Sequence, residues 1–157
     1  GEFLQKQGVN NYMVEIGGEV RCRGRNNKGE IWLIGIDNPK YNEDGKSLKA
    51  TVKLDDMSLA TSGNYRNFYI KNGVKYAHTI NPKTGYPVDH TLLSASVFAE
   101  DCMTADAYAT AFMVMGQKRA KEISEEEKLL VYLIYSDGEG NTQTYMSEGL
   151  RARIIEN

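Results

Sequence analysis

Cysteine, histidine and proline are scarce in this sequence, and the few cysteines and histidines limit the kinds of metal site and catalytic group that it can form. Its 157 residues include two cysteines, two histidines and three prolines. Cys22 and Cys102 stand outside any C-x-x-C spacing and away from clustered histidines, so we do not expect a zinc site. The sequence leaves open whether these two cysteines pair with each other. Because there are only two histidines, each is examined as a candidate catalytic or ligand-binding side chain.

Long apolar runs and an excess of positive charge are also missing. The longest apolar candidate runs from Leu129 to Tyr135, which is the length of a strand and far short of a membrane span. The formal net charge is -2 and the pI is near 5.8, so no basic field is available to attract nucleic acid. Small molecules or proteins are the partners that this composition favours. No basic segment followed by an apolar core marks a signal peptide.

What remains is an ordinary globular composition, with 41% hydrophobic and 25% charged residues. A chain of this length can bury a sizeable core, so we expect a single domain over residues 1–157. Residues Leu48–Leu54 alternate apolar and polar side chains, which predicts a half-buried strand. Further strands are predicted at residues 12–16, 19–24, 31–36, 92–98, 129–135 and 142–146, the second and third as a hairpin, with one more after residue 149.

Three stretches predict helical structure. Asp101–Met115 is rich in alanine and methionine, contains no glycine or proline, and is closed by Gly116, a typical C-terminal stop. A short charged helix is expected over residues 117–125. A helical turn is predicted at Gly1–Gln7, ended by Gly8, and since no N-cap precedes it we expect upstream sequence to be missing. Together the elements predict an α+β fold, a largely antiparallel sheet with packed helices.

A loop that begins at His78 follows the clearest hairpin of the sequence. Two aromatic strands separated by Asn72–Gly73, a pair typical of tight hairpin turns, precede it. In the loop, Pro82 and Pro87 fix their own backbone angles and Gly85 can adopt a positive φ. From these residues alone, two explanations of His78 are equally good: its ring packs at the end of a strand, or it serves in catalysis or ligand binding.

A second candidate group lies in the helix predicted over residues 101–115. Asp106 and Thr110 are four residues apart and project from the same face, so their oxygens can share one hard cation such as Mg²⁺. Alternating alanines around them let a backbone or a ligand come close. In the structural alternative, Thr110 back-bonds within the helix, Asp106 complements the helix dipole, and the alanines pack tightly. From the residues alone this alternative is favoured.

Three other stretches are better explained without chemistry. Gly17–Gly18 after a strand is typical of a turn and lacks the G-x-G-x-x-G pattern of dinucleotide-binding sites. No G-x-S-x-G elbow surrounds Ser62–Gly63, so a turn is favoured over a nucleophile there. His90 lies in polar sequence, where we expect its side chain to be solvated.

Four segments of the chain are informative when taken together: Tyr12–Val20, Ala60–Arg66, His78–Pro87 and Ala105–Thr110. In their sequence, order and spacing they resemble the ApbE family, the FAD:protein FMN transferases. Each segment alone is a weak indication, whereas four in order are specific and outweigh the structural alternatives given above. The resemblance extends over most of the chain and implies an ApbE-like fold of which these residues form the C-terminal portion.

The resemblance implies a magnesium-dependent transfer of FMN from FAD to a threonine hydroxyl of a partner flavoprotein, with release of AMP. FAD is then a substrate, and Asp106 and Thr110, with the carbonyl of Ala109, would hold Mg²⁺ on the pyrophosphate. His78 is the implied general base, because an imidazole titrates near neutrality. The loop residues implied to contact the flavin are Thr79, Ile80, Asn81, Pro82 and Gly85.

Two features depart from the family pattern. The family usually has aspartate where this chain has Asn81, and because an amide keeps much of the hydrogen-bonding geometry we expect the loop to survive. Family members also carry a long N-terminal half with further flavin, adenine and metal contacts. We therefore expect this chain, taken alone, to bind FAD weakly or not at all and to have little activity.

Two other functions fit the same residues. A hydrolase of the family would split FAD into FMN and AMP without a protein acceptor, and a non-catalytic module would bind flavin without any reaction. The resemblance further implies an exported lipoprotein at the periplasmic face of the inner membrane, held there by a lipid anchor, although no lipobox is visible in these residues. The sequence does not identify the acceptor protein or the oligomeric state.

Overall fold

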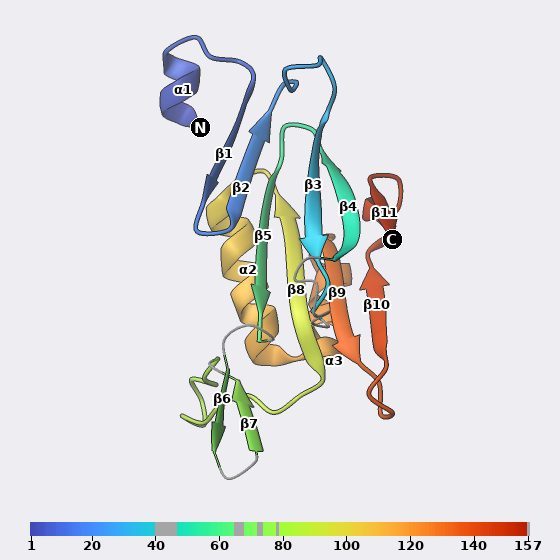
Figure 1. Ribbon diagram of the computed structural model, residues 1–157. Coiled ribbons are helices and arrows are strands. Elements are labelled where there is room, and N and C mark those ends of the chain that lie inside the picture. The colour runs from blue at the N-terminus through green and yellow to red at the C-terminus, as the bar shows by residue number, and fades with distance from the viewer. Residues whose placement is uncertain (40–46, 65–67, 72–73, 78, 157) are drawn as a thin grey trace.

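The computed structural model describes residues 1–39, 47–64, 68–71, 74–77 and 79–156, with residues 68–71 and 74–77 described as backbone. His78, the candidate base, lies outside the described residues. The described chain forms three layers: a central six-stranded sheet, helices on one face of it, and a three-stranded sheet on the other (Figure 1). This architecture confirms the predicted α+β fold.

The strand pairs that the structure describes are antiparallel. The central sheet has the order β1-β2-β5-β8-β9-β10 and consists of β1 (Tyr12–Ile16), β2 (Glu19–Arg23), β5 (Ser58–Gly63), β8 (Leu92–Ala99), β9 (Leu130–Ser136) and β10 (Thr142–Met146). The second sheet has the order β11-β4-β3 and consists of β3 (Trp32–Asp37), β4 (Leu48–Leu54) and β11 (Ile154–Glu156). A separate hairpin is formed by β6 (Phe68–Lys71) and β7 (Val74–Ala77), which confirms the hairpin predicted around residues 72 and 73.

One predicted pairing is wrong. The strands expected at residues 19–24 and 31–36 do not form a hairpin, because β3 pairs with β4 in the second sheet while β1 and β5 take both edges of β2. The chain crosses between the sheets after β2, where the indole nitrogen of Trp32 donates to the carbonyl of Arg23 at 3.1 Å. A short connection between two strands favours their pairing, but it does not reveal whether the second strand extends the same sheet or starts another.

Apolar layers cover both faces of the central sheet, which explains the uninterrupted apolar run of β9. Along this strand Tyr132 and Ile134 face the three-stranded sheet, whereas Val131 and Leu133 face the helices. Successive side chains of a strand point to opposite faces, so a strand covered on both sides is apolar throughout. Cys22 is fully buried in the first of these layers, and burial raises the pKa of its thiol to about 11. It and the other cysteine are free thiols.

The helical layer is built around α2 (Cys102–Met115), which runs along the central sheet (Figure 1). Asp101 caps its N-terminus: one carboxylate oxygen accepts from the Thr104 amide at 2.8 Å and the other from the Thr104 hydroxyl at 2.9 Å. These bonds lower the pKa of Asp101. Buried alanines at positions 105 and 109 bring the helix close to the sheet, and Gly116 with φ of 80° ends it. The helix therefore ends where predicted and begins one residue later than predicted, with Asp101 as its N-cap.

The remaining helical elements are short. The structure has α1 (Glu2–Lys6), α3 (Gln117–Glu126) and a 3-10 turn, η1 (Glu148–Leu150). The first two match the helical turn and the charged helix predicted from the sequence. Of the helices that the structure describes, none has the length and apolar character needed to cross a membrane.

Candidate functional site

A cavity of about 430 Å³ lies where the C-terminal ends of β3 and β5 meet the turn between β1 and β2. Apolar side chains such as Ile34 and Leu59 form one part of its wall. Small or polar residues form the rest: Gly17, Gly18, Gly35, Asp37, Thr61, Ser62, Gly63, Thr79 and Thr110. Apolar walls with a few convergent polar groups are typical of a small-molecule site.

Two glycines bring the backbone to the cavity wall without side chains. Gly17 and Gly18 turn the chain between β1 and β2 with φ of 70° and 107°, the left-handed region that favours glycine. The amide of Gly18 donates to Oε1 of Glu15 at 2.9 Å, which closes the turn. A Cβ at Gly18 would meet nothing within 4 Å, so the space beside it is open. The turn predicted from the sequence is therefore also a wall of the cavity.

The strand β5 supplies a second length of accessible backbone. The strand β2 pairs with β5 at Ser58 and Leu59, and beyond these residues no described strand pairs with this edge. The amide of Asn64 donates toward β8, on the other edge. Because neighbouring residues of a strand point their backbone groups to opposite edges, those of Thr61 and Gly63 point to the unpaired edge along the cavity.

Ser62 joins the strand β5 to the helix α2 at the cavity. Its Oγ lies 3.2 Å from Oγ1 of Thr110, a hydrogen bond in which either hydroxyl can donate. The two residues are 48 positions apart, so sequence spacing does not reveal the contact. Their hydrogen bond fixes the orientation of the Thr110 hydroxyl in the cavity wall.

The outer face of α2 carries two of the three expected metal ligands. Asp106 and Thr110 are both exposed and lie one helical turn apart, as predicted. Ala109 is fully buried against the sheet. Its carbonyl lies inside a continuous helix, where the amide of Met113 is its regular partner, so it is less available to a cation than the two side chains.

Asp106 also lines a second cavity, of about 600 Å³. Ile16 and Glu19, which flank the Gly17–Gly18 turn, line this second cavity, whereas the two glycines line the first. Among the described residues, no three Asp, Glu, His or Cys side chains are grouped so that they could hold a metal ion by themselves. A cation at Asp106 and Thr110 would need water or phosphate oxygens as further ligands, which is how Mg²⁺ is commonly bound.

The loop over residues 79–91 has a defined backbone. Ile80 and Pro87 form an isolated antiparallel bridge, and the carbonyl of Asn81 accepts from the amide of Gly85 at 2.8 Å. Oδ1 of Asn81 accepts from a backbone amide two residues later at 2.9 Å, a contact that an aspartate oxygen would make equally. The loop therefore keeps its shape with asparagine, as expected.

The expected flavin-binding residues lie on different sides of this loop. Thr79 lines the first cavity, Asn81 is half-buried, and three others are exposed: Ile80, Pro82 and Gly85. The residue directly before Thr79 is His78, which lies outside the described part of the chain. The structure thus brings Thr79 and Thr110 to one cavity, with Asp106 one helical turn away.

His90 fastens the loop to α2, and the expectation that its side chain is solvated is wrong. Its Nδ1 accepts from the amide of Leu92 at 3.3 Å, so Nε2 carries the proton and donates to the carbonyl of Met113 at 2.8 Å. Met113 is in the last turn of α2, where carbonyls lack partners within the helix. The polar sequence around His90 gives no indication of the helix end that folds against it.

The chain matches the model of the ApbE family over residues 1–133. It is 42% identical to the FAD:protein FMN transferase of Vibrio cholerae serotype O1 over 139 residues, which are 88% of this chain and 41% of that protein. It is 35% identical to the FAD:protein FMN transferase of Escherichia coli K12 over 153 residues, 98% of this chain and 43% of that protein. The chain spans about two fifths of the length of these curated relatives.

Solved structures agree with the sequence relatives. The flavin transferase ApbE from Vibrio cholerae superimposes with a TM-score of 0.83 at 38% identity, covering 97% of this chain and 47% of that chain. The apo form of the flavinyl transferase ApbE from Pseudomonas stutzeri gives a TM-score of 0.79 at 33% identity, covering 94% of this chain and 44% of that chain. The likeness therefore extends over nearly the whole of this chain and over less than half of each neighbour.

Proposed function

Since this chain belongs to the ApbE family, we propose that it forms part of a magnesium-dependent enzyme that transfers FMN from FAD to a threonine of a partner flavoprotein. The acceptor oxygen forms a bond to the FMN phosphorus, the bond from that phosphorus to the bridging oxygen of the pyrophosphate breaks, and AMP leaves. The proton of the acceptor hydroxyl goes to a base, for which we propose His78. The observation that carries the proposal is the cavity walled by open backbone, Thr79 and Thr110.

The two cavities suit an extended dinucleotide. The backbone amides of Thr61 and Gly63, on the unpaired edge of β5, can donate to phosphate oxygens, and Gly18 leaves the approach free of a side chain. Ile34 and Leu59 offer apolar surface to a ring in the same cavity. The second cavity, beside Asp106, gives room for the other half of such a molecule.

Asp106 and Thr110 are the residues that would hold Mg²⁺ between the two cavities. A carboxylate and a hydroxyl on one helical face are hard oxygen donors of the kind that this ion prefers. When bound, the ion would neutralise charge on the phosphate oxygens and on the departing AMP. Ala109, the third residue expected from the resemblance, contributes in this proposal through its packing, because its carbonyl lies inside the helix.

The loop after His78 is proposed to hold the flavin and the base. A neutral imidazole at His78 accepts the proton from the threonine hydroxyl as the oxygen attacks. Thr79, Ile80 and Asn81 contact the flavin, Ile80 through backbone groups, and the bridge between Ile80 and Pro87 keeps them in place. The loop therefore orients the reacting groups while α2 neutralises the leaving group.

Two alternatives use the same residues. In a hydrolase, water replaces the threonine hydroxyl and the products are free FMN and AMP. In a non-catalytic module, flavin binds and no bond is broken. The relatives from Vibrio cholerae and Escherichia coli are named FAD:protein FMN transferase, which favours transfer to protein over both alternatives.

The test measures AMP release from FAD, with and without Mg²⁺, in the presence of a threonine-containing acceptor peptide. It is made with the 157-residue chain and with the longest natural form of the protein that carries this sequence. A transferase yields AMP and peptide-bound flavin in equal amounts, a hydrolase yields AMP and free FMN, and a binding module yields neither. We expect little turnover by the 157-residue chain, so turnover at the rate of a longer form would contradict that expectation.

Substitutions identify the groups that carry the reaction. Asp106→Asn is expected to lower transfer about 100-fold or more, the effect of removing an electrostatic contact to developing charge. His78→Asn is expected to remove the pH dependence that a base with a pKa near neutrality imposes. Asp55→Asn is the matched control, because Asp55 forms an exposed ion pair with Arg25 and lines neither cavity. Transfer that survives both site substitutions would sink the proposal.

A further inference from the structure

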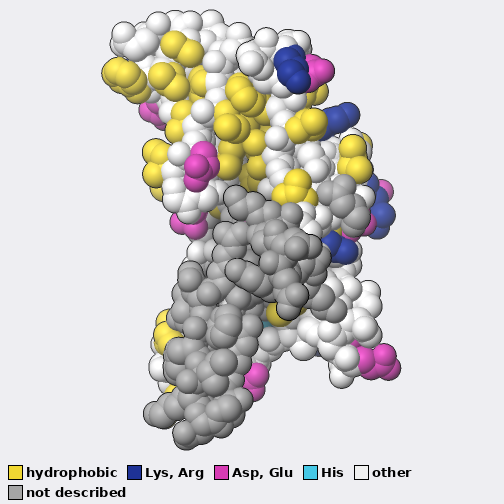
Figure 2. Space-filling view, viewed as in Figure 1, with side chains coloured by type: hydrophobic (Ala, Val, Ile, Leu, Met, Phe, Trp, Pro, Cys, Tyr) yellow, Lys and Arg dark blue, Asp and Glu magenta, His cyan; other side chains and the backbone are white. Residues whose placement is uncertain are grey.

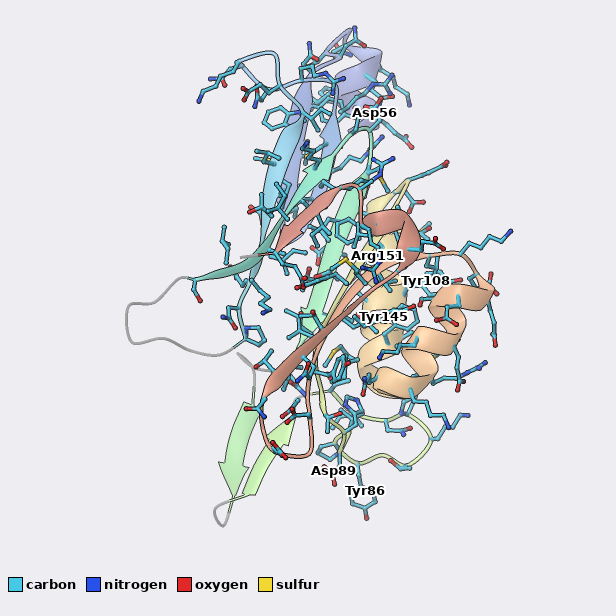
Figure 3. All side chains as sticks on the ribbon, turned by 90° about the vertical axis from the view of Figure 1, so that its right-hand side faces the viewer. Asp56, Tyr86, Asp89, Tyr108, Tyr145 and Arg151 are labelled. Atoms are coloured by element: carbon cyan, nitrogen blue, oxygen red, sulfur yellow. The ribbon has the colours of Figure 1, made fainter. Side chains whose placement is uncertain are left out.

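An exposed aromatic side chain stands at the outer side of the loop over residues 79–91. Tyr86 is 74% exposed and directly precedes Pro87, which forms the bridge to Ile80. Figure 3 shows Tyr86 pointing away from the body of the molecule, and it lines neither of the two cavities. In the view of Figure 2, several exposed hydrophobic side chains gather at the opposite end of the molecule, over α1 and the first strands. Tyr86 therefore stands apart from that group of hydrophobic side chains.

The backbone on both sides of Tyr86 is held in place. Its carbonyl accepts from the amide of Asn81 at 2.9 Å, and its amide donates to Oγ1 of Thr84 at 3.3 Å. Further along, the amide of Val88 donates to the carbonyl of Thr79 at 3.0 Å. A side chain presented by ordered backbone loses little entropy when a partner covers it, and tyrosine has few torsions to fix. Tyr86 is thus preorganised for an interface.

This surface adjoins the proposed reaction site. Thr79 lines the first cavity, and its hydrogen bond to Val88 ties the cavity side of the loop to the stretch that carries Tyr86. His90 fastens the end of the same loop to the last turn of α2. One side of the loop therefore meets the cavity and the other side meets solvent.

We propose that Tyr86 anchors the acceptor protein, by packing its ring on an apolar residue of the extended segment that carries the target threonine. The inference rests on the proposed function, since a transfer to protein requires that segment to reach the cavity beside this loop. Tyrosine is enriched among the residues that dominate interface energies. The exposed Lys83 and Asp89 give the surface a polar rim.

A photo-cross-linking experiment tests the contact without requiring turnover. Tyr86 is replaced with p-benzoylphenylalanine in the longest natural form of the protein, which is irradiated with a flavin-free domain of a flavoprotein that carries its flavin on threonine. The same probe in place of Phe3, which is 72% exposed on α1, is the matched control. Cross-linking to the acceptor domain from position 86 and not from position 3 supports the proposal, and equal or absent cross-linking overturns it.

Kinetics separate acceptor docking from flavin binding. Tyr86→Ser is expected to raise the KM for the acceptor domain about tenfold, the loss typical of a moderate interface anchor, while the dissociation constant for FAD stays within about twofold. Tyr86→Phe keeps the ring and should behave as the unsubstituted protein. Phe3→Ser, at the other end of the molecule, should leave both constants unchanged.

The outcomes distinguish this inference from the function on which it rests. A rise in the FAD dissociation constant of Tyr86→Ser in the absence of acceptor would show that the ring contacts the nucleotide, which overturns the docking role. Normal transfer with an unchanged KM for the acceptor also overturns it and leaves the proposed function standing. If the unsubstituted protein neither binds FAD nor transfers FMN, the proposed function itself fails.

Discussion

The hydroxyl of Ser62 is placed to orient the hydroxyl of Thr110. A threonine that offers its oxygen lone pairs to a cation has to donate its proton elsewhere, and Ser62 Oγ at 3.2 Å is the available acceptor. Groups that orient a metal ligand in this way commonly change metal affinity when they are removed. Ser62 is therefore a positioning residue in the proposed site, although the sequence around it predicts no more than a turn.

Ser62→Ala is expected to weaken the binding of Mn²⁺, used as a spectroscopic substitute for Mg²⁺, about tenfold in the presence of FAD. Electron paramagnetic resonance of free Mn²⁺ measures this affinity directly and does not depend on turnover. Ser136→Ala is the control, since the Ser136 hydroxyl donates to the carbonyl of its neighbour Asp137 and lines neither cavity. An unchanged Mn²⁺ affinity in Ser62→Ala would remove the positioning role.

The buried hydroxyl of Tyr132 and the carboxylate of Glu156 make stability depend on pH. Tyr132 donates to Oε1 of Glu156 at 2.6 Å, and Thr144 donates to the same oxygen at 2.9 Å. The Tyr132 bond is the main cause of a lowered pKa of Glu156, relative to its ordinary value of 4.5. A carboxyl whose pKa is lowered by folding stabilises the native state above its unfolded pKa, and this contribution is lost as the pH falls through the native pKa.

Tyr132→Phe is therefore expected to lower the free energy of unfolding by about 1 kcal/mol at pH 7, a value reduced from that of a buried charged hydrogen bond because Glu156 is exposed. The difference from the unsubstituted protein should shrink below pH 4.5. Urea unfolding at pH 7 and pH 3 measures both values. Tyr135→Phe, which removes a hydroxyl from the same strand, is the control. A difference that stays constant with pH would contradict this account.

At the scale of the elements, the N-cap of α2 stabilises the helix on which the proposed site depends. Asp101→Ala removes both bonds to Thr104 and is expected to cost about 1 kcal/mol of unfolding free energy. Asp101→Asn keeps a cap acceptor and should cost much less. Chemical unfolding followed by circular dichroism measures both variants, and an equal loss in the two would mean that the carboxylate charge matters more than the cap.

His90 links another element to α2, namely the loop over residues 79–91. His90→Ala removes two hydrogen bonds, to Met113 and from Leu92, each worth about 1 kcal/mol. Amide hydrogen exchange at Leu92 and Val88 is expected to become about tenfold faster, while exchange in β9 stays unchanged. His90→Gln, whose amide can donate to Met113, should restore part of the protection. Unchanged exchange in the alanine variant would mean that the loop is held without His90.

The sequence predicts the elements well because their determinants are local. Alternation marks β4, and Asp101 and Gly116 bound α2, as the structure confirms. The pairing of β3 with β4 depends on which strand edges are free after the sheet has formed, so the expected hairpin with β2 is wrong. The contact between Ser62 and Thr110 and the role of His90 depend on tertiary packing over many residues, which no local pattern records.

At the scale of the whole molecule, the central sheet joins the two outer layers. Leu133 packs toward the helices and its neighbours Tyr132 and Ile134 pack toward the three-stranded sheet, so neither layer can separate without exposing β9. The single tryptophan, Trp32, lies on β3 and bonds to Arg23 on β2, across the boundary between the sheets. The three layers should therefore unfold together.

This cooperativity can be measured with two probes. Tryptophan fluorescence reports on the three-stranded sheet through Trp32, and circular dichroism at 222 nm reports mainly on α2 and α3. We expect both to give the same midpoint in urea, as in a two-state transition. Two separated midpoints would show that the outer sheet detaches first, and the layered core would then have to be regarded as two cooperative units.

The short pairing between β2 and β5 also has a consequence for handling the protein in solution. An unpaired strand edge is a template onto which another chain can add a strand, and natural proteins usually cover such edges. Beyond Leu59, the described part of β5 borders the first cavity, so the molecule that fills the cavity also covers the edge. The tendency to aggregate should then depend on ligand occupancy. The ligand-bound protein should remain monodisperse under conditions in which the ligand-free protein polymerises, and storage and crystallisation should benefit accordingly.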